Sequence, residues 1–256
     1  MGGAVSYLRY VAIGDSQTEG LNDGDETTGY RGWADRLAEL LADAEPGVRY
    51  ANLAVRGKLA GQVRAEQLAA ALALRPDLVS VMAGMNDLVR PGCDVGRVAG
   101  ELEAMYAALS GAGARVLTFT FPDVGRIAPV ARGLRPRVVE LNARIRDAAE
   151  RHGAVVVDAF HLPVTCDPRL WSADRIHATP LGHALMAAAA AEALGLPGSD
   201  SAWAEQLAGP PPAMSWRREV VWVGTFLGPW VVRRIRGRSS GDGRSAKRPS
   251  LLPVRP

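Results

Sequence analysis

A serine that follows the first apolar segment of the chain is the strongest candidate for a nucleophile. Ser16 lies in the run Ala12-Ile13-Gly14-Asp15-Ser16-Gln17-Thr18-Glu19-Gly20, just before loop sequence rich in Gly, Asn and Asp. α/β proteins present active-site groups at the ends of such strands. Asp and Ser are also ordinary turn and helix-cap residues, so this triplet by itself predicts little.

Three further short blocks supply the partners that a serine nucleophile needs. They are Asn52-Leu53-Ala54-Val55-Arg56-Gly57, Gly84-Met85-Asn86-Asp87 and Asp174-Arg175-Ile176-His177. A serine hydroxyl requires a base to take its proton, and the base requires a third group to fix its tautomer. Ser16, His177 and Asp174 suit these three catalytic roles.

Attack on a carbonyl creates an oxyanion, which needs donors aimed at it in advance. The candidates for this oxyanion hole are the backbone N–H groups of Ser16 and Gly57 and the side-chain amide of Asn86. Taken alone, Gly57 is more typical of a simple turn, but a glycine at this position also admits a close backbone approach to substrate. Asp15 and Asp87 are interpreted as acceptors that organise their loops rather than as acids in the chemistry.

Together the four blocks resemble the GDSL/SGNH hydrolase family over about residues 8 to 195. The resemblance implies Ser16 for the first block, Gly57 for the second, Asn86 for the third, and His177 with Asp174 for the fourth. The first block reads Gly-Asp-Ser-Gln where the family name has Gly-Asp-Ser-Leu. No Gly-x-Ser-x-Gly elbow surrounds Ser16, which argues against the α/β-hydrolase alternative.

Apolar runs and helical patterns alternate along the chain, which indicates an α/β fold with a parallel sheet covered on both faces. The resemblance implies a three-layer α/β/α, flavodoxin-like sheet of five parallel strands in the order 2-1-3-4-5, with the site at the strands' carboxyl ends. The five expected strands are Tyr10–Ile13, Arg49–Leu53, Leu78–Met82, Arg115–Phe121 and Ala154–Val157. The five expected helices are Trp33–Ala44, Gly61–Leu74, Val95–Ser110, Pro136–His152 and Pro180–Leu194.

Two loops, Leu21–Arg31 and Pro122–Arg135, are candidates for shaping the substrate pocket. Tyr30, Arg31 and Trp33 are weak pocket candidates, because solvated connections have the same composition. His183 follows Pro-Leu-Gly at a helix start and is interpreted as a structural, hydrogen-bonded histidine rather than a second base.

The composition of the 256 residues, 48% of them hydrophobic, fits one substantial core. The two cysteines, Cys93 and Cys166, belong to no metal-binding pattern and are predicted to be free thiols, so we expect neither a metal nor another cofactor. The Arg-, Ala- and Gly-rich composition is typical of a high-GC bacterium. The first residues show no secretory pattern, and we expect a cytoplasmic protein.

The sequence changes character after the hydrolase domain, which we assign to residues 1–198. Residues 201–256 carry ten Lys and Arg residues against three acidic ones, whereas residues 1–200 carry 20 against 24. Residues 199–238 form a Trp- and Arg-rich extension that either docks on the domain or lies on an anionic membrane surface through residues 215–238, including Trp216, Trp222 and Trp230. Residues 239–256 are polar and contain proline, and we expect them to be disordered.

The function predicted from these residues is that of a serine esterase that cleaves an ester, thioester or other acyl group of a small molecule through an acyl-enzyme. An acyltransferase of the same architecture is the first alternative, because it differs only in excluding water from the second step. A non-catalytic scaffold that uses its basic tail is the second. A role in nucleic-acid binding has no supporting fold and ranks last. Substrate identity and oligomeric state stay open.

Overall fold

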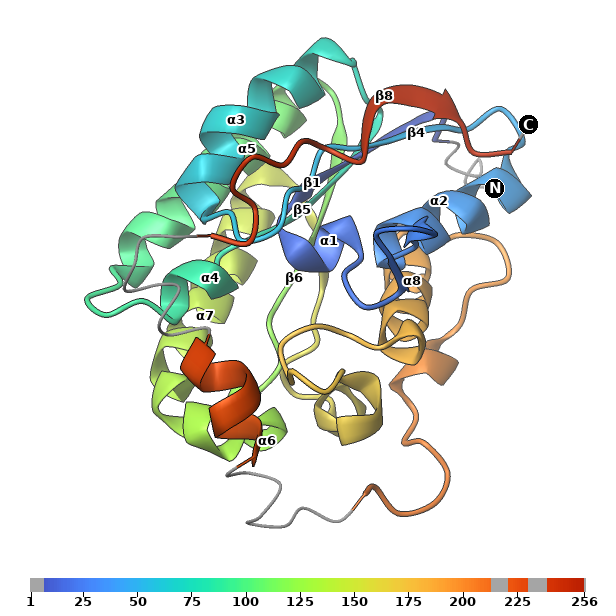
Figure 1. Cartoon of the computed structure of the whole chain (residues 1–256). Helices are drawn as coiled ribbons and strands as arrows, with labels where there is room; N and C mark the ends of the chain where they lie inside the picture. The colour runs from blue at the N-terminus through green and yellow to red at the C-terminus, as the bar shows by residue number, and fades with distance from the viewer. Residues whose placement is uncertain (1–6, 213–220, 230–238, 256) are drawn as a thin grey trace.

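A six-stranded sheet forms the middle layer of the protein, and helices cover both of its faces (Figure 1). The computed structural model describes residues 7–212, 221–229 and 239–255. The strands of the sheet lie in the order β7-β6-β5-β1-β4-β8. Their bounds are β1 (Arg9–Gly14), β4 (Arg49–Asn52), β5 (Leu78–Met82), β6 (Arg115–Phe119), β7 (Val155–Val157) and β8 (Arg248–Pro253). A separate two-stranded hairpin consists of β2 (Gly24–Asp25) and β3 (Gly29–Tyr30).

The first five strands of the sheet are parallel, and their order is the predicted 2-1-3-4-5. Their central members are buried on both faces: every residue of β5 is buried, and so is every residue of β1 after Arg9. Such strands consist of nearly continuous apolar runs, because helices cover both faces of the sheet. This pattern is why their positions could be predicted from the sequence.

The long helices are divided between the two faces of the sheet (Figure 1). On one face α2 packs against α8, and on the other α3 packs against α5 and α5 against α7. Their bounds are α2 (Trp33–Ala44), α3 (Ala60–Ala73), α5 (Val95–Gly111), α7 (Arg135–His152) and α8 (Pro180–Ala193). The short helices are α1 (Ser16–Glu19), α4 (Met85–Leu88) and α6 (Val124–Ile127), and the 3-10 turns are η1 (Pro129–Leu134), η2 (Pro163–Cys166), η3 (Pro168–Leu170) and η4 (Ser201–Ala204). All five predicted helices are confirmed to within one residue at each end.

The sixth strand corrects the prediction that residues 239–256 are disordered. β8 pairs antiparallel with β4, in the register Tyr50↔Leu252 and Asn52↔Arg248. Proline is tolerated in β8 because an edge strand leaves one row of backbone groups unpaired. Side chains add to this pairing: Arg248 Nε donates to the carbonyl oxygen of Tyr50 at 2.8 Å, and its guanidinium lies 5.4 Å from the centre of the Tyr50 ring.

Parts of the extension before β8 contact the domain formed by the sheet and its helices. Trp203 of η4 donates its indole N–H to Glu192 of α8, and Arg169 donates to the carbonyl oxygens of residues 207–209. Residues 221–229 form a short helical segment that includes a π-helical turn, η5 (Val223–Leu227). Trp216, Trp230 and all the arginines of the predicted membrane-surface segment lie outside the described residues. Membrane contact and a cytoplasmic location therefore stay predictions. In the described part of the chain, no helix combines the length and apolar character needed to cross a membrane.

Candidate active site

Ser16 is the first residue of α1, directly after the central strand β1. The turn before it is tight: a Cβ on Gly14 would lie 2.3 Å from the carbonyl oxygen of Met82 on the neighbouring strand. Gln67 secures this turn, because its side-chain amide accepts from Gly14 N at 2.8 Å and donates to Gly14 O at 2.9 Å. The Asp15 side chain caps α1 by accepting from Gln17 N. The serine is thereby fixed at the carboxyl edge of the sheet.

His177 and Asp174 reach Ser16 from the loop before α8. His177 Nε2 lies 2.8 Å from Ser16 Oγ, and His177 Nδ1 lies 2.7 Å from Asp174 Oδ2. Ser16 is 7% exposed. The structure therefore brings together the three residues predicted to form a Ser-His-Asp unit, although Ser16 and His177 are 161 residues apart in the sequence.

The Asp174 carboxylate also organises the loop that carries His177. Its Oδ1 accepts from the Ser172 hydroxyl at 2.6 Å and from the backbone N–H groups of Ile176 and His177 at 2.9 and 3.0 Å. Burial opposes ionisation of this carboxyl, but the hydrogen bonds from His177 and Ser172 outweigh it and hold the pKa of Asp174 well below its ordinary value. Asp174 is thus held as a carboxylate facing His177.

Gln17 is a site residue that sequence reasoning missed. Its Nε2 donates to the carbonyl oxygen of Ile176 at 2.8 Å, and its Oε1 accepts from Ala178 N at 3.2 Å. Ile176 and Ala178 flank His177 in the sequence, so Gln17 joins the turn that carries Ser16 to the loop that carries His177. The only signal in the sequence was the departure from Leu at this position of the motif.

Asn86 connects two of the other candidate loops. It lies in α4, after β5, and its Nδ2 donates to Asp15 Oδ2 at 3.0 Å and to the carbonyl oxygen of Lys58 at 3.1 Å. Burial raises the pKa of Asp15 to about 6. Asp15 and Asp87 act as loop-organising acceptors, as predicted, since Asp87 Oδ2 accepts from Ala60 N at 3.0 Å. An oxyanion role for Asn86 requires it to share or redirect one N–H when substrate binds.

Gly57 lies in the loop after β4, and this position requires a glycine for two reasons. Its φ of +74° is in the left-handed region, and a Cβ on it would lie 2.3 Å from the Ser239 hydroxyl. The group that approaches the Gly57 backbone closely therefore belongs to the C-terminal segment. Gly57 does not line the cavity next to Ser16. The neighbouring Arg56 is buried and pairs with Glu19 at the end of α1.

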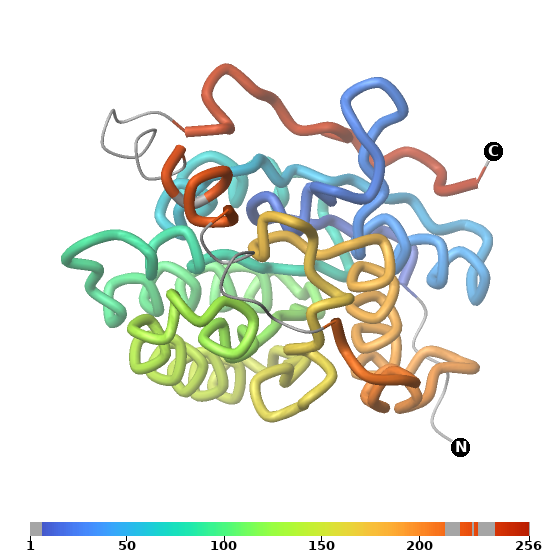
Figure 2. The backbone as a smooth tube through the Cα atoms, turned by 60° about the horizontal axis from the view of Figure 1, so that its bottom comes forward, coloured from blue at the N-terminus to red at the C-terminus, as the bar shows by residue number. Residues whose placement is uncertain are grey.

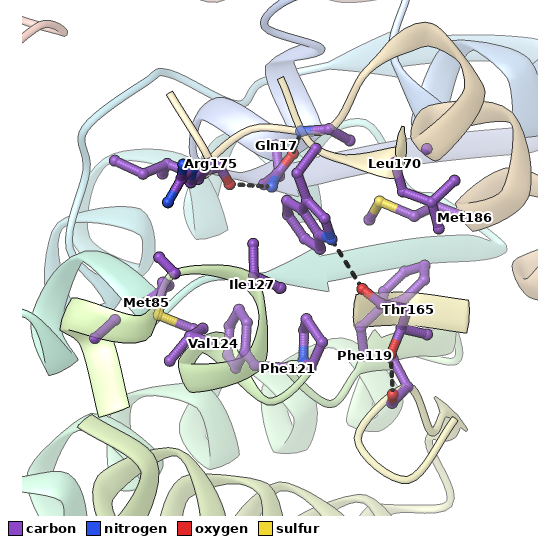
Figure 3. A pocket seen from close by; sticks show the side chains of 18 of the residues that line it. Gln17, Met85, Phe119, Phe121, Val124, Ile127, Thr165, Leu170, Arg175 and Met186 are labelled. Carbon is purple, nitrogen blue, oxygen red and sulfur yellow. Dashed lines mark hydrogen bonds between the residues drawn. The ribbon is translucent and has the colours of Figure 1, made fainter. Parts of the chain in front are cut away.

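A largely apolar cavity of about 500 Å³ opens beside Ser16. Figure 3 shows Gln17 and Arg175 on one side of it and Phe121, Val124 and Ile127 across from them. Other apolar lining residues are Met82, Met85, Val89, Phe119, Leu170, Trp171, Leu185, Met186, Trp203 and Trp222. The volume is in the range of small-molecule sites.

Of the two loops expected to shape the pocket, Pro122–Arg135 contributes and Leu21–Arg31 does not. The prediction that Tyr30, Arg31 and Trp33 line the pocket is wrong, because none of them borders the cavity. The Tyr30 ring lies 4.8 Å from the Arg56 guanidinium, and Arg31 pairs with Glu39 at the surface. Trp33 is fully buried in the core with its ring edge against Phe119. An aromatic residue near a motif is not sufficient evidence for a pocket.

His183 has the structural role that the sequence indicated. It is fully buried, its Nδ1 accepts from Trp33 N at 3.2 Å, and its Nε2 donates to the carbonyl oxygen of Leu21 at 3.0 Å. Burial lowers the pKa of His183 to about 4. Cys93 and Cys166 are free thiols, and the described residues include no group of three or more His, Cys, Asp or Glu side chains that could hold a metal ion.

Comparison with known proteins gives the family. The model of the GDSL-like Lipase/Acylhydrolase family matches residues 12–185. The chain belongs to this family, and it is a GDSL-type esterase whose general reaction is the hydrolysis of esters. No curated protein matches the chain.

Solved structures show the same fold at low sequence identity. LAE5, described as an alpha/beta hydrolase enzyme from the metagenome of Lake Arreo, Spain, is 24% identical; the match covers 76% of this chain and 99% of LAE5, with a TM-score of 0.63. Axe2, an acetylxylan esterase from Geobacillus stearothermophilus, is 20% identical; the match covers 75% of this chain and 96% of Axe2, with a TM-score of 0.62. At these identities the likeness extends to the fold alone.

Proposed function

We propose that this esterase is a serine hydrolase that cleaves small-molecule esters with an apolar acyl chain through an acyl-enzyme. Ser16 is the nucleophile, His177 the general base and then the general acid, and Asp174 the group that fixes the tautomer of His177. The observation that carries the proposal is the continuous pair of contacts, 2.8 Å from Ser16 Oγ to His177 Nε2 and 2.7 Å from His177 Nδ1 to Asp174 Oδ2, at the edge of the cavity.

In the proposed first step, His177 Nε2 takes the proton of Ser16 as Oγ attacks the ester carbonyl. The oxyanion receives hydrogen bonds from the backbone N–H groups of Ser16 and Gly57 and from Asn86 Nδ2. Among the described residues, none accepts a hydrogen bond from Ser16 N or Gly57 N; Ser16 lines the cavity, whereas Gly57 does not and must approach it when substrate binds. His177 then protonates the leaving alcohol, and a water molecule activated by His177 releases the acid.

The lining of the cavity supports an apolar acyl chain rather than an acetyl group. Its volume of about 500 Å³ and its aromatic and aliphatic side chains offer burial to several methylene groups. Each buried methylene contributes about 0.8 kcal/mol. On p-nitrophenyl esters, kcat/KM should therefore rise about fourfold per methylene from acetyl upward until the cavity is filled.

Labelling of the nucleophile tests the mechanism separately from the chain-length preference. A fluorophosphonate should label the wild-type protein once, at Ser16, and should fail to label Ser16→Ala and His177→Ala. Both substitutions should lower kcat by about 10⁴ or more, and the double variant should be no worse than either, because the residues act as one unit. Equal labelling of the His177→Ala variant and the wild type would eliminate His177 as the base, and a maximum on the acetyl ester would eliminate the apolar acyl preference.

A further inference from the structure

Two tryptophans of the C-terminal extension, Trp203 and Trp222, line the cavity of the proposed ester site, and Trp222 is the one next to the histidine loop. Trp222 is 7% exposed, whereas its neighbours Val221 and Val223 are 66% and 37% exposed. The indole of Trp222 lines the same cavity as Ser16. Figures 1 and 2 show the helical segment 221–229, in orange-red, lying against the hydrolase domain rather than extending away from it. This segment therefore inserts one ring into the domain and leaves the apolar residues on either side at the surface.

Trp222 contacts the loop that carries the catalytic histidine. The guanidinium of Arg175 lies 5.0 Å from the centre of the Trp222 ring, and both residues line the cavity. Arg175 stands between Asp174 and His177 and has a φ of +57°, a left-handed conformation that few non-glycine residues adopt. The cation–π contact thus joins the extension to the turn that presents His177.

The buried position of the Trp222 ring carries a cost. Its Nε1 is buried and has no hydrogen-bond partner among the described residues, whereas Nε1 of Trp171 in the same cavity donates to the carbonyl oxygen of Thr165 at 2.8 Å. Within the described part of the chain, Thr18 and Trp33 also carry a buried side-chain atom without a partner, but neither residue lines the cavity. An unpaired buried donor is unfavourable, so packing and the Arg175 contact must hold the ring in place.

We propose that Trp222 is a specificity-determining residue of the esterase: its indole, stacked on Arg175, forms the wall that limits the length and bulk of the acyl group. The proposal rests on the proposed function, because it assigns the cavity to the acyl chain. Acyl groups short enough to fit between Ser16 and the indole lie inside this wall. Longer or branched acyl groups meet the indole and lose rate, since pocket shape discriminates between acyl groups by steric exclusion.

The tests use the full-length chain with three substitutions at this position. Trp222→Phe keeps an aromatic ring against Arg175 and removes the unpaired N–H, so it serves as the matched control. Trp222→Ala removes the wall, and Trp222→Leu is a smaller apolar replacement that keeps part of the packing. For each variant, kcat/KM is measured on p-nitrophenyl esters from acetyl to the longest soluble chain and on branched esters, and Ser16 is labelled with a fluorophosphonate.

We expect the wild type and Trp222→Phe to share one chain-length maximum. In Trp222→Ala and Trp222→Leu the decline beyond that maximum should disappear, so that the ratio of kcat/KM for the longest ester to that for the acetyl ester rises about tenfold or more. An unchanged profile in the Ala and Leu variants would overturn the proposal. An equal loss on every ester would also overturn it, because that result assigns Trp222 a purely structural role on the His177 loop. Failure of wild-type Ser16 to be labelled would instead reject the proposed function itself.

Discussion

Gln17 holds the backbone on both sides of His177, accepting from Ala178 N at 3.2 Å and donating to the carbonyl oxygen of Ile176 at 2.8 Å. The residue that follows the proposed nucleophile thereby fixes the loop that carries its base. We therefore expect the distance from Ser16 Oγ to His177 Nε2 to depend on Gln17 as well as on Asp174. Gln17 is best described as a positioning residue, because its hydrogen bonds go to the histidine loop.

Replacing Gln17 by Leu, the residue in the family motif, should lower kcat about tenfold. Two hydrogen bonds are lost, each worth about 1 kcal/mol, and Ala178 N is left buried without an acceptor. Gln17→Glu keeps the acceptor and should lose less. Gln206→Leu makes the same substitution at an exposed position, so it serves as the control and should keep full activity. Unchanged kcat in Gln17→Leu would show that the loop holds His177 without Gln17.

Asp174→Asn should lower kcat more severely, by about 10³ to 10⁴. If Oδ1 of Asn keeps the bonds from Ser172 and from Ile176 N, its amide N–H₂ faces His177 Nδ1. His177 would then carry its proton on Nε2, where it faces Ser16 and cannot accept a proton. The measurement is kcat on the best p-nitrophenyl ester. Asp167→Asn is the control, because it weakens the ion pair with Arg169 and keeps an oxygen that accepts from Arg169 N. Nearly full activity would mean that other groups orient His177.

Asn86→Ala should lower kcat by about 10² to 10³ with little change in KM, because an oxyanion-hole donor binds the transition state more strongly than the substrate. The side chain also links Asp15 to the carbonyl oxygen of Lys58, so the melting temperature of the variant has to be measured in parallel. A higher KM at constant kcat would make Asn86 an ordinary binding residue.

The stability of the protein should depend on His183 between pH 6.5 and 4. The pKa of His183 is lowered by burial to about 4, whereas it is near 6.5 in the unfolded chain. The unfolded state therefore binds a proton first as the pH falls, and about 3 kcal/mol of stability is lost across this window and retained above it.

His183→Gln supplies the same acceptor and donor without titrating, so its free energy of unfolding should decrease less between pH 6.5 and 4 than that of the wild type. Urea unfolding at a series of pH values measures this difference. His161→Gln, at an exposed position, is the matched control. Parallel curves for His183→Gln and the wild type would contradict the assignment of a buried neutral imidazole.

The parts of the molecule that could be predicted are those whose residues act locally. The helix at Trp33–Ala44 and the strand at Leu78–Met82 follow from hydrophobic periodicity, and both have the expected bounds. The block from Asp174 to His177 is a local turn, so its spacing indicated that the two side chains could meet. The positions of Gln17, Trp222 and β8 depend on contacts between distant segments. The composition of residues 239–256 predicted disorder. Their order comes from pairing with the edge of β4 and from charged partners elsewhere in the chain, which composition does not reveal.

Lys247 is the clearest of these distant contacts. Its ammonium group donates to the carbonyl oxygens of Glu19 and Tyr30 at 2.6 and 2.8 Å and to Asp35 Oδ2 at 2.6 Å. In Figure 2 the red C-terminal segment runs along the blue segments that carry these partners. Burial raises the pKa of Asp35 even though Lys247 opposes that effect. Lys247 therefore joins the C-terminal segment to the end of α1, to β3 and to α2.

Lys247→Met should destabilise the protein by about 3 kcal/mol, because it leaves the Asp35 carboxylate buried without its cation. The midpoint of urea unfolding measures the loss. Adding Asp35→Asn should recover part of it, since an asparagine oxygen still accepts from Gly32 N and carries no charge. Arg255→Met breaks an exposed pair with Asp43 and should have little effect on the midpoint. Equal losses in Lys247→Met and Arg255→Met would show that the contacts of Lys247 contribute no more than a surface ion pair.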